Sequence, residues 1–73
     1  MEVDIMRKEY ALEVRTKGED SRFLYQIDVL QNISEAKALM AECKKDLQED
    51  ERFDILCIEY NDDDEEVDVY SVF

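Results

Sequence analysis

Two segments near the N-terminus alternate apolar and polar residues with a period of two. One side of residues 8–15 carries Tyr10, Leu12 and Val14. One side of residues 22–30 carries Phe23, Tyr25, Ile27 and Val29. Because successive side chains of a strand point to opposite faces of a sheet, both segments are predicted strands. The first alternation extends back to Ile5 and Val3. Residues 16–21 hold the only glycine and predict the loop of a hairpin.

A helical period replaces the strand period after residue 31. Between residues 33 and 48, apolar residues recur at spacings of one, three and four, which predicts one stripe of an amphipathic helix. The stripe consists of Ile33, Ala36, Leu39, Met40, Cys43 and Leu47. Asn32 stands three residues before Glu35, which is typical of a helix N-cap. Residues 48–52 are polar and predict a loop.

The C-terminal part predicts two further strands. Residues 53–60 are apolar on both faces over their middle, which favours a central position in the sheet. Residues 61–65 predict a loop, and residues 66–73 predict the last strand. The expected order of elements is therefore ββαββ.

The predicted fold class is α+β: a four-stranded, mostly antiparallel sheet with one amphipathic helix packed on one face. A chain of 73 residues is expected to form a single domain, residues 1–73. The strand order 2-1-3-4 would make every neighbouring pair antiparallel, but an internal parallel pair is equally compatible with the loops. One helix leaves the other face open, so we expect an apolar patch there, formed by Leu24, Leu30, Leu56, Ile58 and Tyr60 or by the residues that alternate with them. Such a patch favours self-association or a protein partner.

The net charge of the chain excludes some classes of function and disfavours others. There are 21 acidic and 9 basic residues, giving a net charge of −12. This charge excludes a protein that binds nucleic acid directly and disfavours docking on anionic membranes. No apolar run reaches ten residues, so neither a transmembrane helix nor a signal peptide is predicted. Cys43 and Cys57 are interpreted as small buried apolar residues, and the expected location is the cytoplasm.

The negative charge is concentrated at the C-terminus. Residues 53–73 contain eight acidic residues and no basic one, so these carboxylates are expected to lack an internal counter-charge. Seven of the ten residues from Glu59 to Asp68 are acidic. In an extended chain that is one charge per ~5 Å, of the same order as the one per ~3.4 Å of a DNA strand.

The acidic segment and its flanking tyrosines form the candidate partner-binding site. Its residues are Glu59, Tyr60, Asp62, Asp63, Asp64, Glu65, Glu66, Asp68 and Tyr70. In a regular strand Asp64, Glu66 and Asp68 would form a row about 6.7 Å apart, suited to a groove built for phosphates. The tyrosines are expected either to anchor a partner or to pack across strands. A purely solubilising hairpin that protects its edge strand is the alternative interpretation.

Catalytic and metal-binding patterns are lacking in the sequence. It has no histidine, and a single glycine cannot build a phosphate-cradling loop. Counting an EF-hand loop from Asp62 puts Val67 and Phe73 where glycine and glutamate are required. We therefore predict no catalytic residues, no metal site and no cofactor, and the expected class is not an enzyme.

In size, acidity and lack of catalytic residues the chain resembles phage-encoded inhibitors of host defence, such as anti-restriction and anti-CRISPR proteins. The acidic hairpin and the lack of catalytic residues favour a non-enzymatic inhibitor that imitates DNA and acts on a basic, nucleic-acid-binding protein. The resemblance, which is one of composition, would place it in the host cytoplasm. Two alternatives stay open. One is a small cytosolic structural or regulatory domain that forms a homodimer through the open sheet face. The other is an immunity protein or antitoxin that neutralises a basic nuclease.

Overall fold

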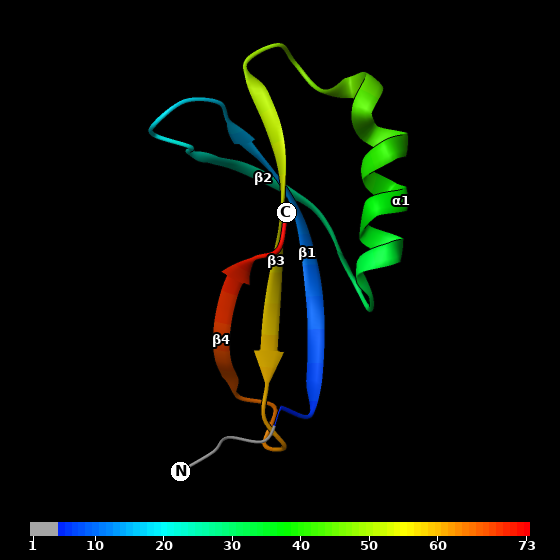
Figure 1. Ribbon diagram of the computed structural model, residues 1–73, viewed down its shortest axis with the longest axis vertical. Helices are drawn as coiled ribbons and strands as arrows, with labels where there is room; N and C mark the ends of the chain where they lie inside the picture. Colours follow the sequence, from blue (N-terminus) through cyan, green and yellow to red (C-terminus); the bar gives the residue numbers. More distant parts are fainter. Residues whose placement is uncertain (1–4) are drawn as a thin grey trace.

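The computed structural model describes residues 5–73, which form one antiparallel sheet and one helical segment (Figure 1). The elements are β1 (Arg7–Thr16), β2 (Phe23–Leu30), α1 (Ile33–Cys43), a short 3₁₀ turn η1 (Lys44–Asp46), β3 (Glu51–Tyr60) and β4 (Glu66–Ser71). The strand order is β2-β1-β3-β4, and each neighbouring pair is antiparallel. The predicted α+β class and ββαββ order are confirmed. The loops allowed either a fully antiparallel sheet or one with an internal parallel pair, and the sheet is fully antiparallel.

Strand boundaries differ from the sequence prediction where polar residues pair. β3 begins at Glu51, two residues before the apolar run, because Glu51 and Arg52 continue the ladder opposite Thr16 and Arg15 of β1. β1 begins at Arg7, so Ile5 precedes the strand, and Val3 lies outside the described residues. Hydrogen-bonded pairing extends strands into polar segments, and the alternation of apolar and polar residues does not predict these extensions.

The helix begins where predicted and ends earlier. The Asn32 side-chain oxygen accepts a hydrogen bond of 2.9 Å from the backbone N–H of Glu35, which satisfies a donor of the first turn. The α-helix ends at Cys43 and tightens into η1, after which Leu47 is extended. The helix therefore does not reach residue 48. Leu47 still packs against the core, from the connection to β3.

The core lies between α1 and one face of the sheet. Leu12, Val14, Ala36, Phe53 and Ile55 form its buried centre. The absence of a large side chain at Ala36, which is fully buried, allows the helix to approach the sheet closely. Partly buried residues surround this centre: Tyr10, Ile27, Leu30, Leu39, Met40, Cys43, Leu47 and Val72. Figure 1 shows α1 beside one end of the sheet, whereas the β3–β4 turn projects from the other end.

Both cysteines are free and contribute apolar surface. Cys57 is buried, and Cys43 is half-buried against the core cluster. Their positions agree with the interpretation of both as small apolar residues.

The expected open-face patch is wrong at Leu30, because β2 is bulged. The register changes between Leu12, which faces Asp28, and Glu13, which faces Gln26, so Ile27 is an extra residue. A second register shift, between Val14 and Arg15, makes Leu24 an extra residue as well. A bulge of this kind reverses the alternation beyond it. As a result Ile27 and Leu30 both pack on the helix side, although simple alternation placed Leu30 on the open face.

Replacing Leu12 with alanine is expected to lower the free energy of unfolding by about 3 kcal/mol, because it opens a cavity in a fully buried site. Urea denaturation followed by circular dichroism measures this change. Met6→Ala is the control, since Met6 is 64% exposed, and it should unfold near the wild-type urea midpoint. Equal midpoints for both variants would contradict the assigned core.

Candidate functional site: the acidic β3–β4 hairpin

The turn between β3 and β4 is organised by Asn61. Its side-chain oxygen accepts hydrogen bonds from the backbone N–H groups of Asp63 (2.9 Å) and Glu65 (3.0 Å). The Asn61 N–H donates to the Glu65 carbonyl at 3.0 Å, closing the turn, and Asp64 has a positive φ of 59°. Asn61 was not among the predicted site residues, although asparagine at the start of a turn is a recognised signal for this geometry.

The turn directs most of the predicted acidic residues into solvent. The exposed members of the predicted site are Asp62, Asp63, Asp64, Glu65, Glu66, Asp68 and Tyr70. Glu59 and Tyr60, at the end of β3, are half-buried. The nine residues therefore lie together on one hairpin, with the charged ones concentrated at its tip.

The expected row of three carboxylates is wrong, because β4 is bulged. Glu66 pairs with Tyr60, whereas Asp68 pairs with Glu59, so Val67 is an extra residue. Neighbouring residues of β3 point to opposite faces, so Glu66 lies on the open face and Asp68 on the helix side. Asp64 belongs to the turn. The acidic side chains consequently surround the end of the hairpin instead of lining one of its faces.

Two basic residues of β1 lie beside the hairpin, which corrects the expectation that its acids lack a counter-charge. Arg7 is 3.5 Å from the Asp64 carboxylate and lies over the Tyr60 ring at 4.2 Å. Lys8 is 3.5 Å from the Glu59 carboxylate. Exposed pairs of this kind contribute at most about 1 kcal/mol each. Among residues 5–73, most of the carboxylates at the tip have no basic side chain beside them.

Tyr70 and Glu59 are linked on the helix side of the hairpin. The Tyr70 hydroxyl donates a 2.8 Å hydrogen bond to Glu59. The pKa of Tyr70 is raised, first by its contact with the Cys57 sulfur and then by the hydrogen bond to Glu59. On the open face, the pKa of Tyr60 is raised mainly by the adjacent Glu9 carboxylate. Each phenol therefore favours its neutral form next to a carboxylate.

Two aspartates cap amides of the edge strands. Asp68 accepts a 2.9 Å hydrogen bond from the N–H of Val69 in β4. Asp28 accepts a 2.8 Å bond from the N–H of Val29 in β2. These strands are the two edges of the sheet, where free N–H groups would invite pairing with another chain. Asp68 therefore combines its negative charge with a structural role.

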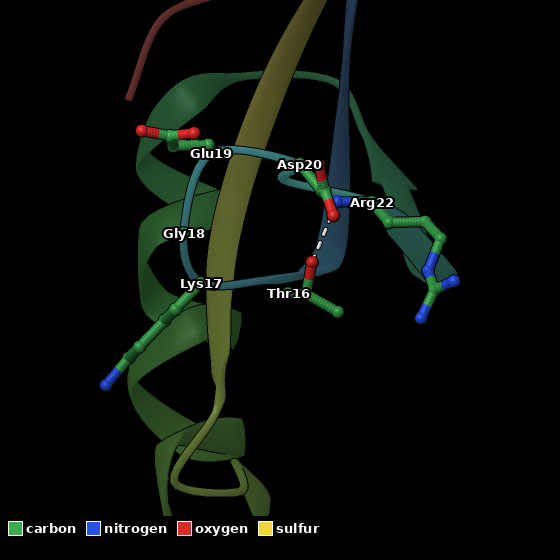
Figure 2. Close-up of a pocket in the computed structure, with 6 residues that line it drawn as sticks. All are labelled: Thr16, Lys17, Gly18, Glu19, Asp20 and Arg22. Carbon is green, nitrogen blue, oxygen red and sulfur yellow. Dashed lines mark hydrogen bonds between the residues drawn. The ribbon is translucent and has the colours of Figure 1, made fainter.

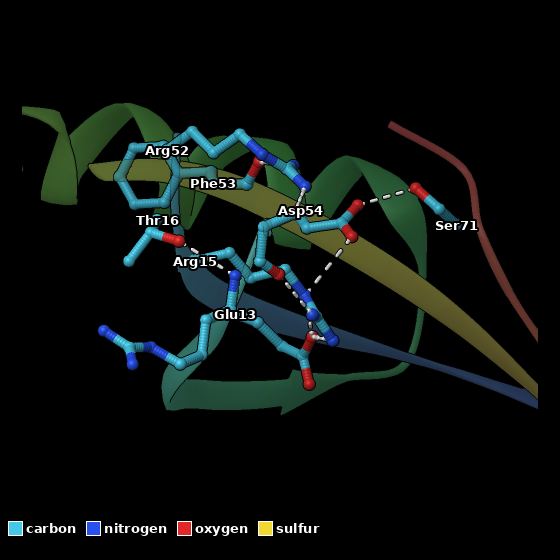
Figure 3. A network of polar contacts seen from close by, with 9 residues as sticks. Glu13, Arg15, Thr16, Arg52, Phe53, Asp54 and Ser71 are labelled. Carbon is cyan, nitrogen blue, oxygen red and sulfur yellow. Dashed lines mark hydrogen bonds and ion pairs between the residues drawn. The ribbon is translucent and has the colours of Figure 1, made fainter. Parts of the chain in front are cut away.

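A second polar cluster lies on the open face near the other end of the sheet (Figure 3). The Arg15 guanidinium is 3.2 Å from Glu13 and 3.7 Å from Asp54, and both acids are only 7% exposed. Arg15 also donates to the Ser21 carbonyl at 2.9 Å, and the Ser71 hydroxyl donates to Asp54 at 2.6 Å. The cluster joins three strands and a loop. Asp54 therefore does not contribute to the exposed acidic surface of residues 53–73.

A shallow concavity of about 450 Å³ lies in the β1–β2 loop (Figure 2). Its charged lining residues comprise two of each sign: Lys17, Arg22, Glu19 and Asp20. The Thr16 hydroxyl accepts a 2.8 Å bond from the Arg22 N–H, and Gly18 has a φ of 99° that favours glycine. This balance of charge selects neither an anion nor a cation, so the acidic hairpin remains the stronger candidate.

Within residues 5–73, no three cysteine or carboxylate side chains are arranged to hold a metal ion. Over the same residues, no helix is long and apolar enough to cross a membrane. No known family model, curated protein or solved structure matches the chain.

The raised pKa of Tyr70 predicts a loss of stability in alkaline solution. A phenol whose pKa is higher in the folded state stabilises the fold below the unfolded value of about 10. This contribution disappears as pH rises through the folded pKa. Urea midpoints of wild type and Tyr70→Phe at pH 8 and 11 measure it. The decrease should be smaller for Tyr70→Phe, and an equal decrease would contradict the linkage.

The crowded carboxylates predict a fold that salt stabilises. Raising sodium chloride from low concentration to about 0.5 M should increase the free energy of unfolding by about 1 kcal/mol, because screening weakens like-charge repulsion. The increase should be smaller in a hairpin variant, defined as Asp62→Asn, Asp63→Asn, Glu65→Gln and Glu66→Gln.

A control variant separates the hairpin from total charge. It neutralises four exposed acids elsewhere: Glu19→Gln, Asp20→Asn, Glu42→Gln and Glu49→Gln. Both variants change the net charge equally, so only local crowding distinguishes them. Identical salt responses of the two variants would show that repulsion is not concentrated at the hairpin.

Proposed function

We propose that this chain is a non-enzymatic inhibitor that binds a basic, nucleic-acid-binding protein by imitating the phosphates of DNA. The main support is the group of exposed carboxylates at residues 62–66, held at one end of the sheet by the Asn61 turn. Fixed negative charges in solvent are what a phosphate-binding surface attracts. Binding would release counterions from the partner, as DNA does, and would therefore weaken with salt.

The distribution of the acids favours a cleft as the partner's binding site. Glu66 lies on one face of the hairpin and Asp68 on the other, with the turn acids between them. A flat basic surface could contact only part of this set. A groove lined with lysine and arginine on both walls could contact all of it. Channels that enclose nucleic acid have this form.

The biological setting that fits this chemistry best is defence and counter-defence. A phage-encoded protein of the anti-restriction or anti-CRISPR type would act in the host cytoplasm on a nucleic-acid-binding effector. An immunity protein or antitoxin that neutralises a basic nuclease would use the same charges and the same steering of association. In each case the protein acts by occupying a surface and needs no catalytic group.

The test is a pull-down in which duplex DNA competes with the immobilised chain for the captured protein. The wild-type chain, the hairpin variant and the control variant are immobilised and exposed to a bacterial lysate at low and high salt, with and without duplex DNA. We expect the wild type and the control variant to retain a protein that binds DNA. Duplex DNA, high salt and the hairpin substitutions should each release that protein, because all three act on the same electrostatic contact.

Two results would contradict this function. Capture that survives in the hairpin variant would remove the hairpin from the contact. Equal losses in the hairpin and control variants would show that net charge, and not the arrangement at the hairpin, is responsible.

A further inference from the structure

The open face of the β3–β4 end carries an apolar strip formed by Leu56, Ile58 and Val69. Ile58 and Val69 pair across β3 and β4, and Leu56 follows two residues earlier on the same face of β3. Leu56 and Ile58 are half-buried, and Val69 is 40% exposed. The helix packs on the other face, against β1 and β2, and does not cover this strip.

Two acidic residues and one basic residue border the strip. The basic residue, Arg7, pairs with Tyr60 and lies 3.5 Å from the Asp64 carboxylate. Glu9 of β1 pairs with Ile58 on one side. Glu66 pairs with Tyr60 at the end nearest the turn. The strip therefore lies directly beside the acidic tip, on the same face as Glu66. A partner that grips the tip from this side would also cover apolar surface.

The helix side of the same hairpin is already occupied by internal contacts. Tyr70 lies against Cys57 and donates to Glu59, which Lys8 also contacts. The β4 edge is closed at Val69, whose N–H is bonded by Asp68. A partner strand would have to displace that bond. Docking on the open face requires no such rearrangement.

We propose that the apolar strip is the second part of the contact, covered by apolar side chains of the basic partner while its lysine and arginine residues bind Glu9, Glu66 and the turn. The proposal rests on the proposed function and deepens it. Electrostatic binding alone would accept any polycation, whereas an apolar contact selects basic proteins that carry matching side chains.

Charge favours a basic partner over a second copy as the occupant. Each chain has a net charge of −12, and a two-fold contact over the strip would bring Glu9 and Glu66 of both copies together. Such like-charge contacts oppose association. A basic surface meets the same acids favourably.

The test uses two synthetic peptides with six lysines each, one carrying two leucines and the other two serines at the same positions. Fluorescence anisotropy measures their dissociation constants for the wild type. We expect the leucine peptide to bind about tenfold more tightly, because part of two leucine side chains becomes buried. Val69→Thr should reduce this preference to about twofold, since it puts a hydroxyl into the strip.

Leu24→Thr is the matched control. Leu24 is 38% exposed on β2, at the opposite edge of the sheet, and its replacement should leave the tenfold preference unchanged. Urea midpoints of both variants establish that they are folded. The hairpin variant should bind both peptides weakly.

The outcomes separate the two proposals. Equal binding of the two peptides to the wild type, lost in the hairpin variant, would overturn the role of the strip and leave electrostatic binding intact. Binding that is unchanged in the hairpin variant would overturn the electrostatic contact itself. A wild-type dimer in sedimentation equilibrium that Val69→Thr dissociates would assign the strip to a second copy and overturn the basic partner.

Discussion

The pairing of β1 with β3 positions both the core and the acidic hairpin. Ten consecutive residue pairs join these central strands without a register shift. Leu12 faces Ile55 and Val14 faces Phe53, and these four side chains build most of the buried centre beneath α1. Because strand faces alternate, this register also determines which residues of β1 and β3 lie on the open face. A slip of one residue would exchange the core for the polar cluster around Arg15.

The same register determines which acidic residues have a basic neighbour. Lys8 faces Glu59 and Arg7 faces Tyr60, so the two basic residues at the start of β1 reach the hairpin that has none of its own. At the other end, Arg15 holds two nearly buried carboxylates. The densest group of exposed acids lies at the β3–β4 turn, at the opposite end of the sheet from the helix-covered core (Figure 1). Repulsion therefore acts mainly where the chain is exposed, which is also where a basic partner could reach it.

Much of the fold could be predicted because periodicity reports burial directly. Period-two alternation located β1 and β2, the helical stripe located α1 and its Asn32 cap, and a doubly apolar run located β3 at the centre of the sheet. The hairpin position of the nine candidate site residues also followed from these elements. Their pairing could not be predicted, since it depends on the residues opposite them. Arg7, Lys8 and Glu9 have no special pattern in the sequence and acquire their roles only from the β1–β3 register.

The class of fold, the order of elements and the concentration of negative charge at residues 59–68 can be read from the amino-acid sequence, because they depend on local patterns and composition. Tertiary structure alone decided how the charge is presented. The bulges at Ile27 and Val67 arise from strand pairing, and each reverses the faces of the residues beyond it. One moved Leu30 into the core, and the other separated Glu66 from Asp68. The alternation of apolar and polar residues does not reveal a bulge, because the extra residue is defined only by pairing with the neighbouring strand.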